Sequence, residues 1–299
     1  IQKVFLNCFF NSSGTKIEFE NLVSNEKTDF SRYNYFYANY LKNTGKVQGA
    51  KSIIQNSLKK YPRNLLLNQY KIDLEKSENN LIFNCNKKEH IIAEILYISA
   101  NALSSQSIFQ SSNFYLNLAK FLNSSFYTFD TLLAENLYKN ENYSDAIKIY
   151  DKIKNYGEAF QWYSNKQISR IMIIDGKKDL AYSSLKKAYI NLSNKGIYET
   201  FDFAEFLKNN EKFEESIKYY TNILKKIKKE HPLFPEVADS RGVAFERSGD
   251  WEKAEKDLLA SLESSPNQAY VINYLAYSWI EQGVKIQESL RMLKKANDL

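Results

Sequence analysis

The chain has 299 residues, of which 43% are hydrophobic and 25% are charged; this is enough apolar material to bury a core, and it excludes global disorder. Its nine glycines and four prolines are too few for the many tight turns of an all-β fold, so the composition favours helices. The formal net charge of +6 is mild for this length and lacks the clustered excess of a dedicated nucleic-acid binder.

The first 30 residues are predicted to form an irregular segment. Residues 1–10, IQKVFLNCFF, lack the basic and long apolar regions of a signal peptide, and one interpretation is the end of a truncated repeat. We therefore expect the chain to be a fragment or a processed form. The compartment stays open, either the cytoplasm or, with a leader missing from this chain, the periplasm or envelope.

Cys8 and Cys85 stand in no metal or redox spacing, so we expect both to serve as apolar packing residues rather than as a disulfide or a zinc site.

One spacing recurs along residues 31–299. Relative to Ala254, a small residue, Gly242, stands twelve positions earlier and an apolar residue, Leu258, stands four positions later. Ala50 has Ala38 and Ile54 at the same offsets. The further anchors of this spacing are Ser112, Ala146, Ala181, Ser216 and, with a shift of one residue, Ser289. Ser112, Ala146, Ala181 and Ser216 follow one another at intervals of 34, 35 and 35 residues, and a fixed period near 34 is the signature of a helical repeat.

Each repeat contains two apolar segments of helical period separated by a short polar break. Gly45, Gly176 and Gly249 fall where the first helix must end in a left-handed residue. The small residues at the anchor, and twelve positions before it, are expected where the two helices touch most closely.

This pattern resembles the tetratricopeptide repeat (TPR) family, whose 34-residue unit carries an aromatic, a Leu-Gly pair, a Tyr, an Ala, a Phe and a Pro. The best matches are residues 235–268, 31–64 and 162–195, although the leading aromatic is mostly absent and serine replaces the anchor alanine at three places. The end of the chain is similar to long multi-repeat TPR proteins, often from alphaproteobacteria, that have no assigned catalysis. The resemblance implies an all-α fold, a right-handed α-solenoid of stacked antiparallel helix pairs. We expect about seven or eight pairs over residues 31–299, with an irregular unit around residues 65–92.

No catalytic motif is found. HExxH, GxSxG, GxxxxGK and GxGxxG are all missing from the sequence, and the two histidines, His90 and His231, lack ligand spacing. We therefore expect no enzymatic activity, no cofactor, no metal and no small-molecule substrate. The expected function is that of a scaffold or adaptor that binds a partner protein or peptide.

The resemblance places the partner in a concave groove lined by the first helix of each pair. The residues that offsets assign to this groove are Arg32, Tyr35, Asn39, Tyr97, Asn101, Glu135, Tyr163, Lys166, Arg170, Phe201, Asp202, Glu205, Asp239, Asn273 and Tyr277. Some family members clamp a peptide carboxylate with Lys, Asn and Arg over successive repeats. Here Lys166 and Arg170 are followed one repeat later by Asp202 and Glu205, so the alternating charge favours a mixed-charge or extended partner.

Two alternatives remain open. The chain could instead be a non-catalytic arm of a larger enzyme or cell-envelope complex. It could also contact an anionic membrane surface, or less plausibly nucleic acid, through lysine clusters that end the second helices. These clusters are Lys59–Lys60, Lys186–Lys187, Lys225–Lys226, Lys228–Lys229 and Lys294–Lys295.

Overall fold

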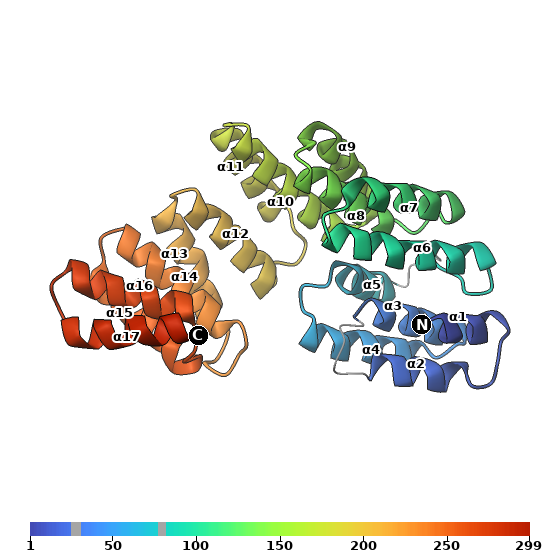
Figure 1. The fold of residues 1–299 in the computed structure, drawn as a ribbon, viewed down its shortest axis with the longest axis horizontal. Coiled ribbons are helices and arrows are strands. Elements are labelled where there is room, and N and C mark those ends of the chain that lie inside the picture. Colours follow the sequence, from blue (N-terminus) through green and yellow to red (C-terminus); the bar gives the residue numbers. More distant parts are fainter. Residues whose placement is uncertain (25–30, 77–81) are drawn as a thin grey trace. The chain divides into compact units, whose positions relative to one another are not determined.

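A computed structural model describes residues 1–24, 31–76 and 82–299 of the chain, and within these ranges the fold is all-α, with no strand (Figure 1). The α-helices are joined by short turns into antiparallel hairpins. Two compact units result, Ile1–Ser184 and Leu185–Leu299, which we call unit 1 and unit 2. The predicted all-α architecture of paired helices is confirmed.

Unit 1 contains the N-terminal hairpin, an unpaired helix and the following hairpins. Its helices are α1 (Gln2–Phe9), α2 (Thr15–Val23), α3 (Ser31–Asn43), α4 (Val47–Lys60), α5 (Leu65–Glu75), α6 (Lys88–Ser105), α7 (Phe109–Leu122), α8 (Thr128–Lys139), α9 (Tyr143–Ile153), the short 3-10 helix η1 (Lys154–Tyr156) and α10 (Glu158–Ile174). Residues 82–87, before α6, are not helical. The boundary between the units falls inside α11 (Lys178–Ile190).

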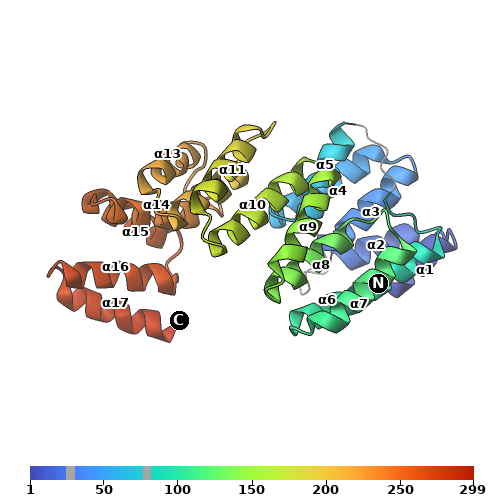
Figure 2. The ribbon, with the colours of Figure 1, turned by 90° about the horizontal axis from the view of Figure 1, so that it is seen from above.

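Unit 2 consists mainly of three hairpins. Its helices are α12 (Ile197–Asn209), α13 (Phe213–Leu224), α14 (Phe234–Arg247), α15 (Trp251–Ser264), α16 (Ala269–Glu281) and α17 (Ile286–Asp298). Within each hairpin the second helix runs back along the first, as α16 and α17 show in both views (Figures 1 and 2). The first helices α12, α14 and α16 therefore follow one another in the unit, with a second helix after each.

The small residues of the repeating spacing lie in the helix–helix contacts. Ala50, Ala146, Ala181 and Ala254 are all fully buried. At the best-matching repeat, a β-carbon added to Gly242 would lie 3.2 Å from the carbonyl oxygen of Ala254. The two backbones are therefore in direct contact, which explains why the spacing demands small side chains.

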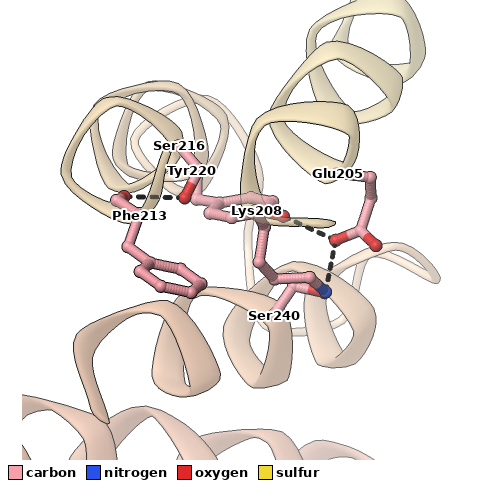
Figure 3. A network of polar contacts seen from close by, with 6 residues as sticks. All are labelled: Glu205, Lys208, Phe213, Ser216, Tyr220 and Ser240. Carbon is pink, nitrogen blue, oxygen red and sulfur yellow. Dashed lines mark hydrogen bonds and ion pairs between the residues drawn. The ribbon is translucent and has the colours of Figure 1, made fainter. Parts of the chain in front are cut away.

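The serine anchors are also buried, and each satisfies its hydroxyl locally. Ser112 donates a hydrogen bond to the carbonyl oxygen of Ala100 at 2.7 Å, and Ser216 donates to that of Phe213 at 2.7 Å (Figure 3). Ser289 donates to Lys285 at 3.1 Å. A buried hydroxyl with a hydrogen-bond partner costs little, so serine can replace alanine at these positions.

Cys8 and Cys85 form a disulfide bond, which corrects the expectation of two unpaired cysteines. Their α-carbons are 5.8 Å apart, and the bridge spans 77 positions of the sequence. It joins α1 to the non-helical segment that precedes α6. The spacing arguments overlooked it because a bridge over a long sequence separation depends on how the hairpins stack, which local patterns do not encode.

Candidate functional site

Side chains from successive hairpins line a cavity of about 500 Å³ in unit 1. The first helices α3, α6 and α8 contribute most of its wall, and the starts of α5 and α10 complete it. The lining residues are Ile1, Ser31, Arg32, Tyr33, Asn64, Leu65, Leu66, Tyr97, Ile98, Asn101, Thr128, Thr131, Leu132, Glu135 and Phe160. Four of the predicted groove residues therefore meet at one place: Arg32, Tyr97, Asn101 and Glu135.

Arg32 makes a bidentate ion pair with Glu94 at the wall of this cavity. Its Nε and Nη2 atoms each lie 2.7 Å from a different carboxylate oxygen, and Glu94 is fully buried. The guanidinium also stacks on the ring of Tyr97 at 3.7 Å. Burial disfavours the charge of Arg32, but the adjacent carboxylate outweighs this effect and raises its pKa. The guanidinium thus stays charged while it is fixed in one orientation.

Glu94 was not among the predicted site residues. It precedes Tyr97 by three positions and Asn101 by seven, so the three residues share one face of α6. That spacing, together with the cation Arg32 on the earlier first helix α3, is the sequence signal that could have identified Glu94.

Two threonine hydroxyls in the cavity wall have no hydrogen-bond partner among the described residues. They are Oγ1 of Thr128 and Oγ1 of Thr131, both on α8. Thr128 is only 6% exposed. Both threonine oxygens are inaccessible to solvent, so the polar side chains that the cavity offers to a ligand are those of Arg32, Asn101 and Glu135.

The next predicted residues extend from this cavity along α10. Tyr163 donates a hydrogen bond to Glu135 at 2.7 Å, and burial together with this carboxylate raises the pKa of Tyr163. Lys166 lies 5.8 Å above the ring of Trp162, and Arg170 is exposed, with Nη1 3.4 Å from the side chain of Gln167. This part of unit 1 therefore carries one carboxylate, Glu135, and two cations, Lys166 and Arg170.

Three predicted groove residues are buried instead, which corrects their assignment to a binding surface. Tyr35 is fully buried, with its ring 4.8 Å from that of Tyr70 on α5. Asn39 is 4% exposed and donates to the carbonyl oxygen of Phe83 at 2.9 Å. Phe201 is 2% exposed in the core of unit 2. Neighbouring segments cover these positions, which a count of offsets along one helix does not reveal.

In unit 2, the predicted residue Glu205 of α12 belongs to a polar network that also includes Lys208, Tyr220 and Ser240 (Figure 3). Oε1 of Glu205 accepts hydrogen bonds from Tyr220 at 2.5 Å and from Lys208 at 2.9 Å, and Lys208 also reaches Ser240 at 3.0 Å. Asp239, the residue before Ser240, is partly buried. Burial raises its pKa to about 7, and the attraction of Lys208 only partly opposes this. Asp202 is half-buried on α12.

The last two predicted residues, Asn273 and Tyr277, line a second cavity, of about 240 Å³, between α14 and α16. The other lining residues are Glu246, Arg247, Tyr270, Tyr274, Ser278 and Glu281. Tyr270 and Tyr277 are 64% and 55% exposed. This cavity therefore presents two accessible aromatic rings beside carboxylates.

The lysine clusters at the ends of the second helices make several contacts within the protein. Lys186 pairs with Glu215 and Lys229 pairs with Glu263, both at 2.8 Å, and Lys295 donates to the carbonyl oxygen of Pro266. The described residues contain no cluster of His, Cys, Asp and Glu that could hold a metal ion. Within the same ranges, no helix has the length and apolar character that a membrane crossing requires.

Comparison with known proteins identifies the architecture. Neither a family model nor a characterised protein matches the sequence. Among solved structures, the chain is similar to the APC/C hetero-tetramer Cut9–Hcn1, with a TM-score of 0.52, 15% identity, and coverage of 98% of this chain and 59% of that one. Weaker similarity extends to YrrB, described as a TPR protein with an unusual peptide-binding site (TM-score 0.40, 18% identity, 68% of this chain and 95% of that one). It also extends to MamA of RS-1 (TM-score 0.46, 9% identity, 57% of this chain and 93% of that one).

The fold is therefore that of a TPR protein, as the repeating spacing predicted. At 15% identity the similarity to Cut9–Hcn1 establishes the architecture alone. Function has to be argued from the residues of this chain.

Proposed function

We propose that this protein is a non-catalytic scaffold that binds an extended segment of a partner protein on the first helices of its hairpins. The observation that carries the proposal is the convergence of α3, α6 and α8 on one cavity whose wall includes the polar side chains of Arg32, Asn101 and Glu135. An extended segment offers a regular row of backbone carbonyl oxygens and N–H groups, which is what such a surface needs. The similarity of fold to TPR proteins, one of which is described as peptide-binding, is consistent with this function.

Rigid positioning of the polar groups supports the same interpretation. Arg32 is held by Glu94 and Tyr97, and Glu135 is held by Tyr163. Side chains that are fixed before binding lose little entropy when a ligand arrives, so several weak contacts can add up to useful affinity.

The test is a selection of peptides from a random display library on the intact chain. Binding of the selected peptides is then compared for Asn101→Ala, which changes the cavity wall on α6, and Asn117→Ala, which changes an exposed asparagine on the partner helix α7. We expect Asn101→Ala to weaken binding about tenfold, and Asn117→Ala to leave it unchanged. Failure to select any peptide, or equal effects of the two variants, would contradict the proposal.

A further inference from the structure

Unit 2 presents a surface of carboxylates and tyrosines. It consists of Glu205 on α12, Asp239 and Glu246 on α14, and Tyr270, Tyr277 and Glu281 on α16, and we call it the acidic face. Glu246, Tyr270, Tyr277 and Glu281 line the same cavity. Burial raises the pKa of Tyr270, and the negative charges of Asp239 and Glu205 add to this effect, so both carboxyl groups lie within electrostatic range of the cavity.

The charge of this surface is opposite to that of the whole chain. The chain carries a net charge of +6, whereas the acidic face has four carboxyl groups, of which Glu205 pairs with Lys208 and Glu246 pairs with Arg247. Lys208 is already bound to Glu205 and Ser240. Arg247 lies 3.4 Å from Glu246. Asp239 therefore has no ion-pair partner of its own within the described ranges.

The exposed tyrosines favour a particular kind of cation. Tyr270 and Tyr277 are 64% and 55% exposed and stand two helical turns apart on α16, with Asn273 between them at the cavity. The face of a tyrosine ring attracts a cation, and arginine engages such faces more often than lysine does. A guanidinium can also donate bidentate hydrogen bonds to a carboxylate at the same time.

We propose that the acidic face binds a segment of a partner protein that presents arginine side chains, with guanidinium groups placed between the tyrosine rings and the carboxylates. This inference rests on the proposed function and names the chemistry of the partner at unit 2. Charge complementarity decides the occupant, since a nucleic acid or an anionic membrane would bring its phosphates against four carboxyl groups.

Binding of such a segment should be coupled to the titration of Asp239. The groups that face this carboxyl are Lys208 and Glu205 from α12, Tyr220 from α13, Glu236 and Ser240 from its own helix, and Tyr270 from α16. Because burial raises the pKa of Asp239 to about 7, an incoming cation favours loss of its proton. Affinity is therefore expected to rise between pH 6 and pH 8, with protons released on binding.

The experiment uses the intact chain and a peptide in which arginine alternates with serine. Two matched peptides carry citrulline, the uncharged analogue of arginine, or glutamate in its place. Isothermal titration calorimetry in buffers of different ionisation enthalpy reports both the affinity and the protons released. We expect the arginine peptide to bind at least about tenfold more tightly than the citrulline peptide, and the glutamate peptide not to bind. Because the chain as a whole is basic, nonspecific electrostatic attraction would favour the glutamate peptide over the arginine peptide. It would therefore oppose the expected result rather than imitate it.

Variants locate the binding. Asp239→Asn should abolish the pH dependence and the proton release, and Tyr277→Ala should weaken binding about tenfold. Glu252→Gln, which removes an exposed carboxylate from α15, should change neither. Asn101→Ala in unit 1 should also leave arginine binding intact.

Equal affinity for the arginine and citrulline peptides, or equal effects of Asp239→Asn and Glu252→Gln, would overturn the inference. If library-selected peptides still bind unit 1 in that case, only this inference fails and the proposed function stands. If neither kind of peptide binds, both fail.

Discussion

Gly242 faces the backbone of Ala254 so closely that a β-carbon on the glycine would lie 3.2 Å from the alanine carbonyl oxygen and 3.0 Å from Cγ of Leu258. Both residues belong to the hairpin of α14 and α15. Glycine in a helix normally costs stability relative to alanine, so its presence here reflects the space between the two helices rather than the preference of α14 itself.

Substitution of Gly242 by alanine should therefore not give the gain in stability that is usual within a helix. Gly242→Val is expected to lower the free energy of unfolding by about 1–3 kcal/mol through overpacking, and Gly242→Ala should give no gain. Gly49→Ala on α4 is the control, because a β-carbon there would meet nothing nearer than 3.5 Å, and it should stabilise by about 0.5 kcal/mol. Urea unfolding followed by circular dichroism measures all three. Equal stabilisation by the two alanine variants would show that α14 and α15 leave space for a β-carbon at residue 242, and it would contradict the prediction.

Removing only one partner of the Arg32–Glu94 ion pair should lower the free energy of unfolding more than removing both partners. Glu94→Gln leaves a guanidinium without its buried counter-ion, and we expect a loss of about 3–5 kcal/mol in the free energy of unfolding. The double variant Arg32→Met with Glu94→Met should recover most of this loss, since it buries no charge. Lys148→Met, which removes an exposed pair with Asp145, should change stability by less than about 0.5 kcal/mol. Similar losses for Glu94→Gln and Lys148→Met would mean that the Arg32 pair is solvated.

The disulfide between Cys8 and Cys85 should stabilise unit 1. Closing a loop of this length restricts the unfolded chain, and removal of such a bridge typically costs about 2–5 kcal/mol. We expect dithiothreitol to lower the thermal midpoint of the wild-type chain, and to have no effect on the double variant Cys8→Ser with Cys85→Ser. Free thiols in the protein purified from an oxidising compartment, detected by alkylation and mass spectrometry, would count against the bridge. Such bonds persist in oxidising compartments, so the compartment in which the chain is expressed has to be chosen accordingly.

Asp239 should make stability depend on pH in a direction opposite to that of a paired carboxylate. Its folded-state pKa of about 7 lies above the ordinary value of 3.8, so between these values the folded state retains a proton that the unfolded state has lost. The stabilisation from this group is present at low pH and is lost as the pH rises through 7. Asp239→Asn should therefore be more stable than the wild type at pH 8, by about 1–3 kcal/mol, with a smaller gap at pH 5. Thermal midpoints at the two pH values test this, and a gap that is constant with pH would contradict it.

The paired-helix fold could be predicted from the sequence because close helix contacts constrain residue size at fixed offsets. Ala50, Ala146 and Ala254 mark such contacts directly. Ser112 and Ser216 could be accepted as substitutes because serine is small, and the structure shows that each also pairs its hydroxyl with a nearby carbonyl oxygen. These constraints act within one hairpin, so local spacing is sufficient to reveal them.

The candidate site was predictable only in part, because it depends on which segments cover which helices. Asn101 and Glu135 reach the cavity as their offsets suggested. Tyr35 has the same offset on α3 as Tyr97 has on α6, but α5 places Tyr70 against it and buries it. Asn39 is buried against residue 83, in the non-helical segment before α6. Irregular segments of this kind follow no repeat, and their effect on neighbouring side chains cannot be obtained from a period.

The disulfide also alters how proteolysis would affect this protein. Hairpins in a repeat array contact mainly their neighbours, so a single cut in an exposed turn would ordinarily allow the terminal hairpin to separate. Here one cut between Cys8 and Cys85 would leave both pieces covalently joined. Helix α1 would thus remain attached to the segment before α6 in an environment that contains proteases, for as long as that environment is not reducing.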